Sequence, residues 1–145
     1  MPRLETIGTL NRLIRTCRDV EALCAACSEA ANAPAQAQAL HQRSEEWARQ
    51  GDELQALVLL LDGKPATSGS WRAPLARALV TLKCLALGRD DLLILDSAFH
   101  SQLRALECYE ESLEGYLPER IRRTVSLHAQ RIADRLEAFE ALPSV

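Results

Sequence analysis

The sequence contains few aromatic residues and few β-branched aliphatic ones. Aromatic side chains make up 4% of the 145 residues, and valine and isoleucine are scarce beside leucine and alanine. β-Branched and aromatic residues favour strands, whereas straight-chain residues lose little rotamer freedom in a helix. The composition therefore argues against a β fold and predicts an all-α protein.

The sequence also lacks a long apolar run and an excess of charge of one sign. Its longest apolar stretch, residues 54–61, is interrupted by Gln55 and falls well short of the roughly 20 residues that span a bilayer. The net charge is −3, with 26% charged residues of both signs interspersed. Because such a pattern creates no strong field, we predict neither a membrane span nor nucleic-acid binding.

No secretory signal and no disulfide framework are apparent. The amino-terminal segment MPRLETIGTL lacks an apolar core, and the five cysteines are an odd number, which favours reduced thiols in the cytoplasm. Cys24 and Cys27 have a redox spacing, but a reactive pair normally lies at a helix start, where the thiol pKa is lowered. These two fall late in a helical pattern on one apolar stripe with Cys17, so we predict buried thiols.

Apolar residues recur at spacings of three and four, which predicts five helices. These helices are expected at about residues 6–31, 34–61, 71–87, 91–114 and 118–141. Gly51 lies on an inward stripe and is expected to admit a bulky neighbour such as a tryptophan, with a modest kink of the helix as the alternative. The predicted inward residues of the four long helices are Ile7, Leu10, Ile14, Cys17, Cys24 and Cys27; Leu40, Trp47, Leu54, Val58 and Leu61; Leu92, Leu95, Phe99, Leu103, Leu106 and Leu113; and Ile121, Val125, His128, Ile132, Leu136 and Phe139.

The turns between these helices predict the topology. Very short turns near Pro34 and Pro118 require two antiparallel helical hairpins, whereas the connection over residues 62–90 is long. Two hairpins joined by one long crossover are typical of ferritin-like bundles. We therefore predict a single domain over residues 1–145, a ferritin-like antiparallel four-helix bundle whose crossover contains a fifth, shorter helix.

Several strings carry a family resemblance over roughly residues 6–139. They are residues 10–14 (LNRLI) with 17–19 (CRD), residues 63–65 (GKP) with 68–70 (SGS), and Tyr109 followed by Leu117 and Pro118. In this order and spacing the chain resembles a bacterial family of ferritin-like four-helix-bundle proteins classed as a domain of unknown function. The resemblance implies a ferritin-like bundle and no particular activity. It also implies a glutamate where this chain has Gln102 and a histidine where it has Ala133.

A complete di-iron site is not predicted. Such sites combine glutamates with Glu-x-x-His motifs, because two cations need several hard oxygens and imidazoles between the helices. The residues three positions before the histidines are Gln38, Ser97 and Val125, and none of them is a good iron ligand.

A reduced metal site remains open as an alternative. Glu21 and His128 lie near inward stripes, with Glu45 or Glu46 at a similar level, and together they would hold a single iron or zinc ion. In the structural alternative, His128 is a hydrogen-bonded core residue and Glu21 is its buried partner.

The predicted crossover helix is apolar on more than one face, although it covers the bundle on one side. We therefore expect Trp71, Leu75, Leu79 and Leu82 to contribute to a homodimer interface.

No nucleotide-binding loop or catalytic arrangement is found at a recognisable spacing. The leading hypothesis is a non-enzymatic bundle that acts through self-association or a protein partner. One alternative is a ferritin-like iron or zinc protein, with oxidase or storage activity and a degenerate site. Another is a carrier of small apolar ligands in the bundle core.

Overall fold

The computed structural model describes residues 2–69, Val80 and 91–140. These residues form four α-helices and no strand, which confirms the predicted all-α four-helix bundle. The helices are α1 (Pro2–Ala30), α2 (Pro34–Leu60), α4 (Asp91–Glu114) and α5 (Glu119–Glu140).

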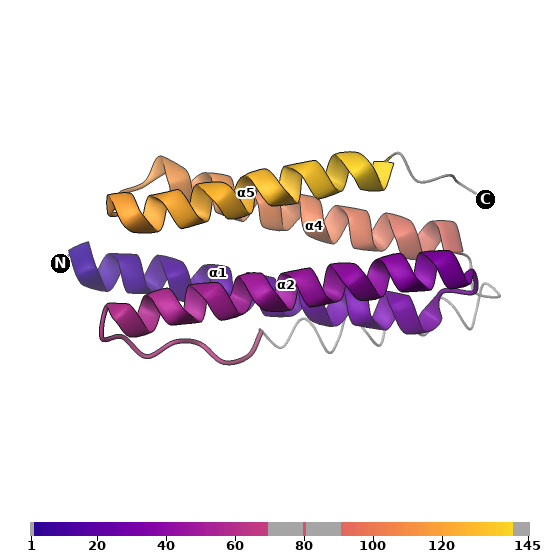
Figure 1. Cartoon of the computed structure of the whole chain (residues 1–145), viewed down its shortest axis with the longest axis horizontal. Helices are drawn as coiled ribbons and strands as arrows, with labels where there is room; N and C mark the ends of the chain where they lie inside the picture. The colour runs from indigo at the N-terminus through magenta and orange to yellow at the C-terminus, as the bar shows by residue number, and fades with distance from the viewer. Residues whose placement is uncertain (1, 70–79, 81–90, 141–145) are drawn as a thin grey trace.

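The helices form two layers, α1 with α2 and α4 with α5 (Figure 1). The chain reverses between α1 and α2 and again between α4 and α5, and α4 begins at the end of the bundle opposite to the one where α2 ends. Side chains fix both ends of the first layer. Arg3 donates to the Leu61 carbonyl near the start of α1, and the Asp91 carboxylate accepts the backbone N–H groups of Asn32 and Ala33 at 2.9 and 3.0 Å.

The predicted fifth helix over residues 71–87 lies outside the described residues, apart from Val80. Val80 is helical and buried. It belongs to a small core cluster with Leu23, Leu40 and Ile94.

The helix boundaries differ from the predicted ones mainly at the start of α1. This helix begins at Pro2, four residues before the predicted start, and a proline suits this first position because its missing N–H would have no partner there. Within the first turn the Thr6 hydroxyl donates to the Pro2 carbonyl at 2.8 Å. The second helix of the hairpin, α2, stops at Leu60 because Asp62 adopts a left-handed φ of 57°. The Gly63 N–H then returns to the Val58 carbonyl at 3.0 Å, as in a common helix-ending motif.

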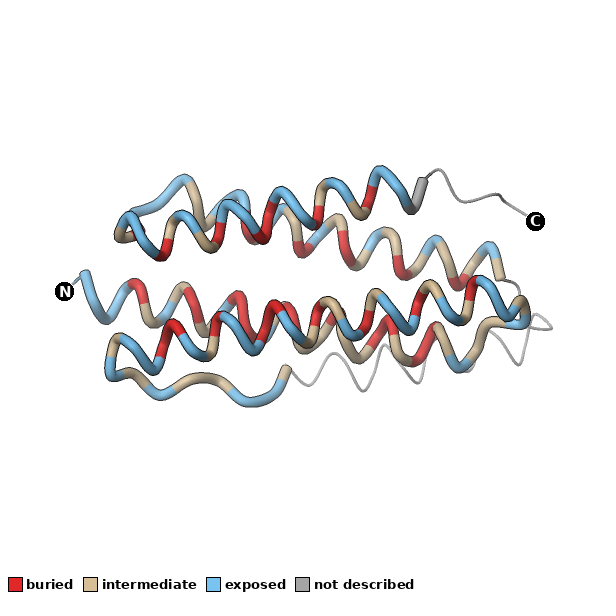
Figure 2. The backbone as a smooth tube through the Cα atoms, viewed as in Figure 1, coloured by how far each residue is buried: buried red, intermediate tan, exposed pale blue. Residues whose placement is uncertain are grey.

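The inward faces of α1, α2 and α5 agree with the predicted stripes, which appear as rows of buried residues in Figure 2. Ile7 and Leu61 are partly buried and pack against the core, and Phe139 lies outside the described side chains. The predicted residues that are buried are Leu10, Ile14, Cys17, Cys24 and Cys27 in α1, Leu40, Trp47, Leu54 and Val58 in α2, and Ile121, Val125, His128, Ile132 and Leu136 in α5.

The inward face predicted for α4 is wrong by a small rotation. Leu92 is exposed, while the other residues of the predicted stripe, Leu95, Phe99, Leu103, Leu106 and Leu113, are partly buried and pack at the sides of the core. The rotation has a physical reason, because the centre of the bundle contains polar groups that need partners from α4. The innermost residues of α4 are Ile94, Ala98, Gln102, Ala105 and Tyr109.

The neighbour of Gly51 is an arginine and not a tryptophan. A Cβ atom at Gly51 would lie 2.8 Å from Nη1 and 2.9 Å from Cζ of Arg18. The Arg18 guanidinium crosses α2 at this point and donates to the Ala48 carbonyl at 3.1 Å and to the Asp52 carboxylate at 2.7 Å. The glycine thus makes room for a cross-helix ion pair. Within the part of the chain that the structure describes, no helix is both long and apolar enough to cross a membrane.

Candidate functional site

A buried polar network joins all four helices near the middle of the bundle. Its centre is the hydroxyl of Tyr109 on α4, which is fully buried. This oxygen lies 3.1 Å from Nδ1 of His128 on α5, 3.2 Å from Sγ of Cys17 on α1 and 3.3 Å from Nε2 of Gln50 on α2. One hydroxyl therefore ties together a residue from each of the other three helices.

The donors and acceptors of this network favour a neutral His128. Gln50 donates to the Tyr109 oxygen and the Cys17 thiol is a weak donor, so the tyrosine O–H is directed to Nδ1 of His128. The other ring nitrogen, Nε2, then donates to the Glu53 carboxylate at 2.5 Å. A second proton on His128 would point at an oxygen that already accepts two donors.

Burial lowers the pKa of His128 below its ordinary value of 6.5, and this outweighs the opposing effect of the Glu53 carboxylate. The guanidinium groups of Arg131 and Arg135 lower it further. Arg131 also lies 4.0 Å from the second oxygen of Glu53. The imidazole, although next to a carboxylate, is thus held in its neutral form by its surroundings.

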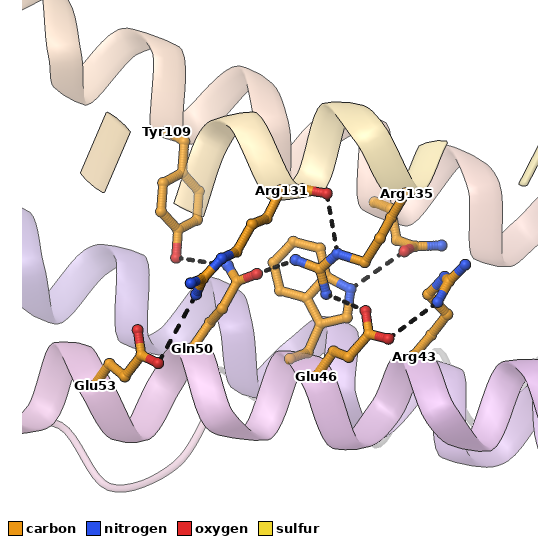
Figure 3. Close-up of polar contacts among 9 residues, drawn as sticks. Arg43, Glu46, Gln50, Glu53, Tyr109, Arg131 and Arg135 are labelled. Atoms are coloured by element: carbon orange, nitrogen blue, oxygen red, sulfur yellow. Dashed lines mark hydrogen bonds and ion pairs between the residues drawn. The ribbon is translucent and has the colours of Figure 1, made fainter. Parts of the chain in front are cut away.

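A second part of the network surrounds Trp47, about one turn along α2. The indole N–H of Trp47 donates to the Gln102 side-chain oxygen at 3.2 Å, and the Arg135 guanidinium lies 5.3 Å from the centre of the indole ring. Arg135 also donates to Gln50 and, at 2.8 Å, to Glu46. Figure 3 shows Glu46, Gln50 and Glu53 on α2 reaching toward Arg131 and Arg135 on α5. The seam between α2 and α5 is bridged by long polar side chains.

An open groove of about 490 Å³ lies over this seam. Three acidic and three basic side chains contribute to its lining, so it carries no excess of charge of one sign. Two ion pairs lie within the groove, Glu46 with Arg135 and Glu53 with Arg131. The lining residues are Glu46, Arg49, Gln50, Glu53, Arg131, Asp134 and Arg135.

The predicted buried thiols are confirmed for the first helix. Cys17, Cys24 and Cys27 are buried, Cys108 is partly exposed, and none of these four described cysteines is in a disulfide. Burial raises the pKa of Cys17 to about 12 and raises the pKa of Cys24 as well. Because the thiolate is the reactive form, these thiols behave as small apolar groups. Cys84 lies outside the described residues.

The candidate metal ligands lie in separate contacts. Glu21 pairs with Arg18 at 3.1 Å, and Glu45 pairs with His41 at 3.4 Å on an exposed face. Glu46 pairs with Arg135 at 2.8 Å and with Arg43 at 3.1 Å. His128 is paired with Glu53, and not with Glu21. Among the described residues, no group of three or more His, Cys, Asp or Glu side chains is arranged to hold a metal ion.

Sequence reasoning missed several residues of this network, among them Tyr109, Gln50 and Arg135, and Glu53 is the clearest case. It follows the exposed Asp52 and lies off the apolar stripe of α2, and its side chain is 49% exposed while the His128 side chain is 0% exposed. The signal was the histidine itself, because a buried imidazole on an apolar stripe needs partners for both nitrogens. The sequence separation of 75 residues gave no indication of which carboxylate would supply one.

A different surface lies at one end of the bundle, where α1 begins, α2 ends and α4 turns into α5 (Figure 1). Four large apolar side chains are exposed there: Leu4 (59%), Leu59 (61%), Leu60 (61%) and Tyr116 (62%). We call these four residues the apolar end.

A pocket of about 250 Å³ lies at the same end, between the last turn of α2 and the first turns of α5. Its lining is apolar except for Arg120 and comprises Leu57, Leu60, Leu61, Pro118, Arg120 and Ile121. The run of three leucines at positions 59–61 was the sequence signal for this surface, since one helix face can bury two of them at most. The predicted interface residues Trp71, Leu75, Leu79 and Leu82 lie outside the described residues.

Comparison with known proteins gives one family match. A family model described as "Domain of unknown function (DUF2383)" matches residues 5–115, which is most of the chain. A search of curated proteins gives no match.

Strings that carried the resemblance contact one another in the structure. Asn11 donates to the Lys64 carbonyl at 3.1 Å and accepts the Ala66 N–H at 2.8 Å. A Cβ atom at Gly69 would clash with the Asp19 carboxylate. The segment after α2 is therefore held along α1 by these residues.

Proposed function

The chain belongs to the family described as Domain of unknown function (DUF2383), and because that description assigns no role, we propose one from the geometry. We infer a non-enzymatic helical bundle of ferritin-like build that acts by self-association, as a homodimer in the bacterial cytoplasm. The observation that carries this proposal is the apolar end.

The apolar end supports association because it exposes four large apolar side chains to water at one end of the bundle. Fully burying a leucine or a comparable side chain stabilises by about 1.5–3 kcal/mol. A two-fold contact would bury the four residues of both copies, against an association cost of about 4–15 kcal/mol. Because these side chains are 59–62% exposed and not fully exposed, the gain and the cost are of similar size, and the dimer we propose is weak and dissociates on dilution.

A ferritin-like metal protein is the less favoured alternative. The His128–Glu53 pair is the best remaining donor set, but a cation there would also face the guanidinium groups of Arg131 and Arg135. Like charges a few ångströms apart repel strongly in a partly buried site. We therefore propose that guanidinium groups balance the carboxylates of this seam in place of metal ions.

The cytoplasmic assignment is likewise part of the proposal. It is supported by the four described cysteines, none of which is in a disulfide, because exported proteins more often use their cysteines in disulfides.

Light scattering coupled to size-exclusion chromatography tests the proposal over a range of protein concentrations. We expect a mass of twice 16.0 kDa that falls toward the monomer on dilution. The double variant Leu59→Ser/Leu60→Ser should remain monomeric at concentrations where wild type dimerises. Leu127→Ser is the matched control, because Leu127 is an exposed leucine on α5 outside the apolar end.

A monomer at every accessible concentration would overturn the proposal. Stoichiometric iron or zinc in the purified protein, measured by mass spectrometry of the elements, would favour the metal alternative instead.

A further inference from the structure

The apolar end contains an exposed aromatic side chain and an apolar pocket side by side. We propose that Tyr116 of each copy inserts into the pocket of a second copy, so that two identical contacts form across a two-fold axis. This inference rests on the proposed self-association and specifies its geometry.

The pocket has the dimensions and lining that suit an aromatic ring. Its volume is about 250 Å³, and it is open on one side and lined by Leu57, Leu60 and Leu61 on the α2 side and by Pro118 and Ile121 on the α5 side. Arg120 supplies its charged edge. Tyrosine is an amphipathic side chain, which buries its ring while its hydroxyl keeps a polar partner.

Tyr116 is presented on a turn that other side chains hold in place. It lies between α4 and α5 and is 62% exposed. Arg122 donates to the Leu113 and Gly115 carbonyls, each at 2.7 Å, which fixes the backbone that leads into this tyrosine. A side chain on an ordered turn loses less freedom when it is bound.

The position of the pocket explains why the occupant is a second copy of this chain. Tyr116 is two residues before Pro118 and five before Ile121, so the inserted group and the receiving pocket lie on the same surface. An isologous dimer requires such self-complementarity, because the same patch from both subunits must meet.

The charges next to the two features are also complementary. Glu114 precedes Tyr116 by two residues and is exposed, and Arg120 is exposed at the pocket. Neither side chain makes a hydrogen bond or an ion pair within the part of the chain that the structure describes. Insertion of Tyr116 would bring Glu114 of one copy toward Arg120 of the other, and the pairing would occur twice.

Sedimentation equilibrium of single variants is the first test. Tyr116→Ala removes both inserted rings of the dimer. Because truncation of a central aromatic residue typically costs tenfold or more in affinity, we expect the dissociation constant to rise by about a hundredfold or more. Tyr116→Phe keeps the ring and should stay within about tenfold of wild type, and Leu127→Ala is the control for loss of an exposed apolar side chain elsewhere.

A mixing experiment tests the reciprocal geometry directly. Leu60→Trp places a large side chain at the mouth of the pocket from an exposed position, so this variant has a free Tyr116 but a blocked pocket. Tyr116→Ala has a free pocket but no ring. Each variant alone should be monomeric, whereas an equimolar mixture should form a heterodimer through one remaining contact.

The outcomes separate the two proposals. A wild-type monomer would overturn self-association and this inference together. A wild-type dimer that Tyr116→Ala leaves unchanged would overturn only the inserted tyrosine, and self-association would stand. Failure of the mixture to form a heterodimer, or growth of wild type beyond a dimer, would contradict the two-fold arrangement. Circular dichroism of each variant verifies that the helices are intact, and both substituted positions are exposed.

Discussion

Replacing Tyr109 with phenylalanine should destabilise the bundle while leaving its apolar packing unchanged. The substitution removes one oxygen atom and retains the ring. Three groups lose a hydrogen-bond partner: Nδ1 of His128, Nε2 of Gln50 and the thiol of Cys17. Since His128 is fully buried, water cannot replace the lost partner without opening the core.

The expected magnitude follows from these three contacts. A buried polar group left without a partner costs about 1–3 kcal/mol. This cost falls on His128 Nδ1 and on Gln50 Nε2, because the bond between Gln50 and Arg135 uses the amide oxygen of Gln50. Cys17 contributes less, since a thiol is a weak donor. We therefore expect the free energy of unfolding to fall by roughly 2–3 kcal/mol, which corresponds to a decrease in melting temperature of roughly 6–12 °C for a chain of this length.

Urea denaturation followed by circular dichroism measures this change as a shift in midpoint at constant slope. Tyr116→Phe is the matched control, because it removes the hydroxyl of an exposed tyrosine and should alter stability by less than about 0.5 kcal/mol. Both variants are compared at a protein concentration where wild type is monomeric. Equal stability of the two variants would refute the view that the Tyr109 hydroxyl organises the core.

Three further predictions concern the same network and its neighbours. Burial lowers the pKa of His128 from 6.5 in the folded protein, so the unfolded chain takes up a proton at a higher pH than the folded protein does. The free energy of unfolding should therefore fall as the pH is lowered below 6.5. The slope should be at most about 1.4 kcal/mol per pH unit. His128→Gln should remove this slope in urea denaturation between neutral and mildly acidic pH, whereas the exposed-site control His41→Gln should keep it; an unchanged slope in His128→Gln would contradict the assignment. Gly51→Ala should stabilise the Arg18→Ala variant by about 1 kcal/mol. In the wild-type protein this gain should be cancelled or reversed, because the Arg18 guanidinium would have to move. Equal effects of Gly51→Ala in the two backgrounds of this double-mutant cycle would contradict the contact between Gly51 and Arg18. Finally, the native protein is treated with iodoacetamide and its peptides are analysed by mass spectrometry, which should find Cys108 labelled before Cys17 and Cys24. A urea-unfolded sample is the control. Rapid labelling of Cys17 in the native protein would contradict its burial.

Sequence patterns predicted the helices well because each long helix repeats its apolar residues at helical spacing. The inward stripe of α5 was predicted up to Leu136, including the burial of His128. Short turns containing Pro34 and Pro118 fixed the two hairpins. These features depend on residues close in sequence, and their spacing is therefore visible without a structure.

The face of α4 and the partners of the polar core were not predictable in the same way. The inward face of α4 was predicted from its leucines. In the structure, Gln102 and Tyr109 lie at the centre instead, because Trp47 and His128 need hydrogen-bond partners there. Such requirements arise between helices that are distant in sequence. The identity of Glu53 as the partner of His128 likewise depends on how α2 and α5 are aligned along the bundle axis.

The buried network also determines which alignment of the helices along the bundle axis is stable. A stripe of leucines packs almost as well after one helix slides along another by one turn, about 5.4 Å. The Tyr109 hydroxyl does not tolerate such a slide, because its contacts with α1, α2 and α5 at 3.1–3.3 Å would all be lost at once. Each misaligned bundle would bury unpaired polar groups and would lie well above the native arrangement in free energy. A core of polar residues thus supplies the uniqueness that an apolar core of repeated leucines lacks.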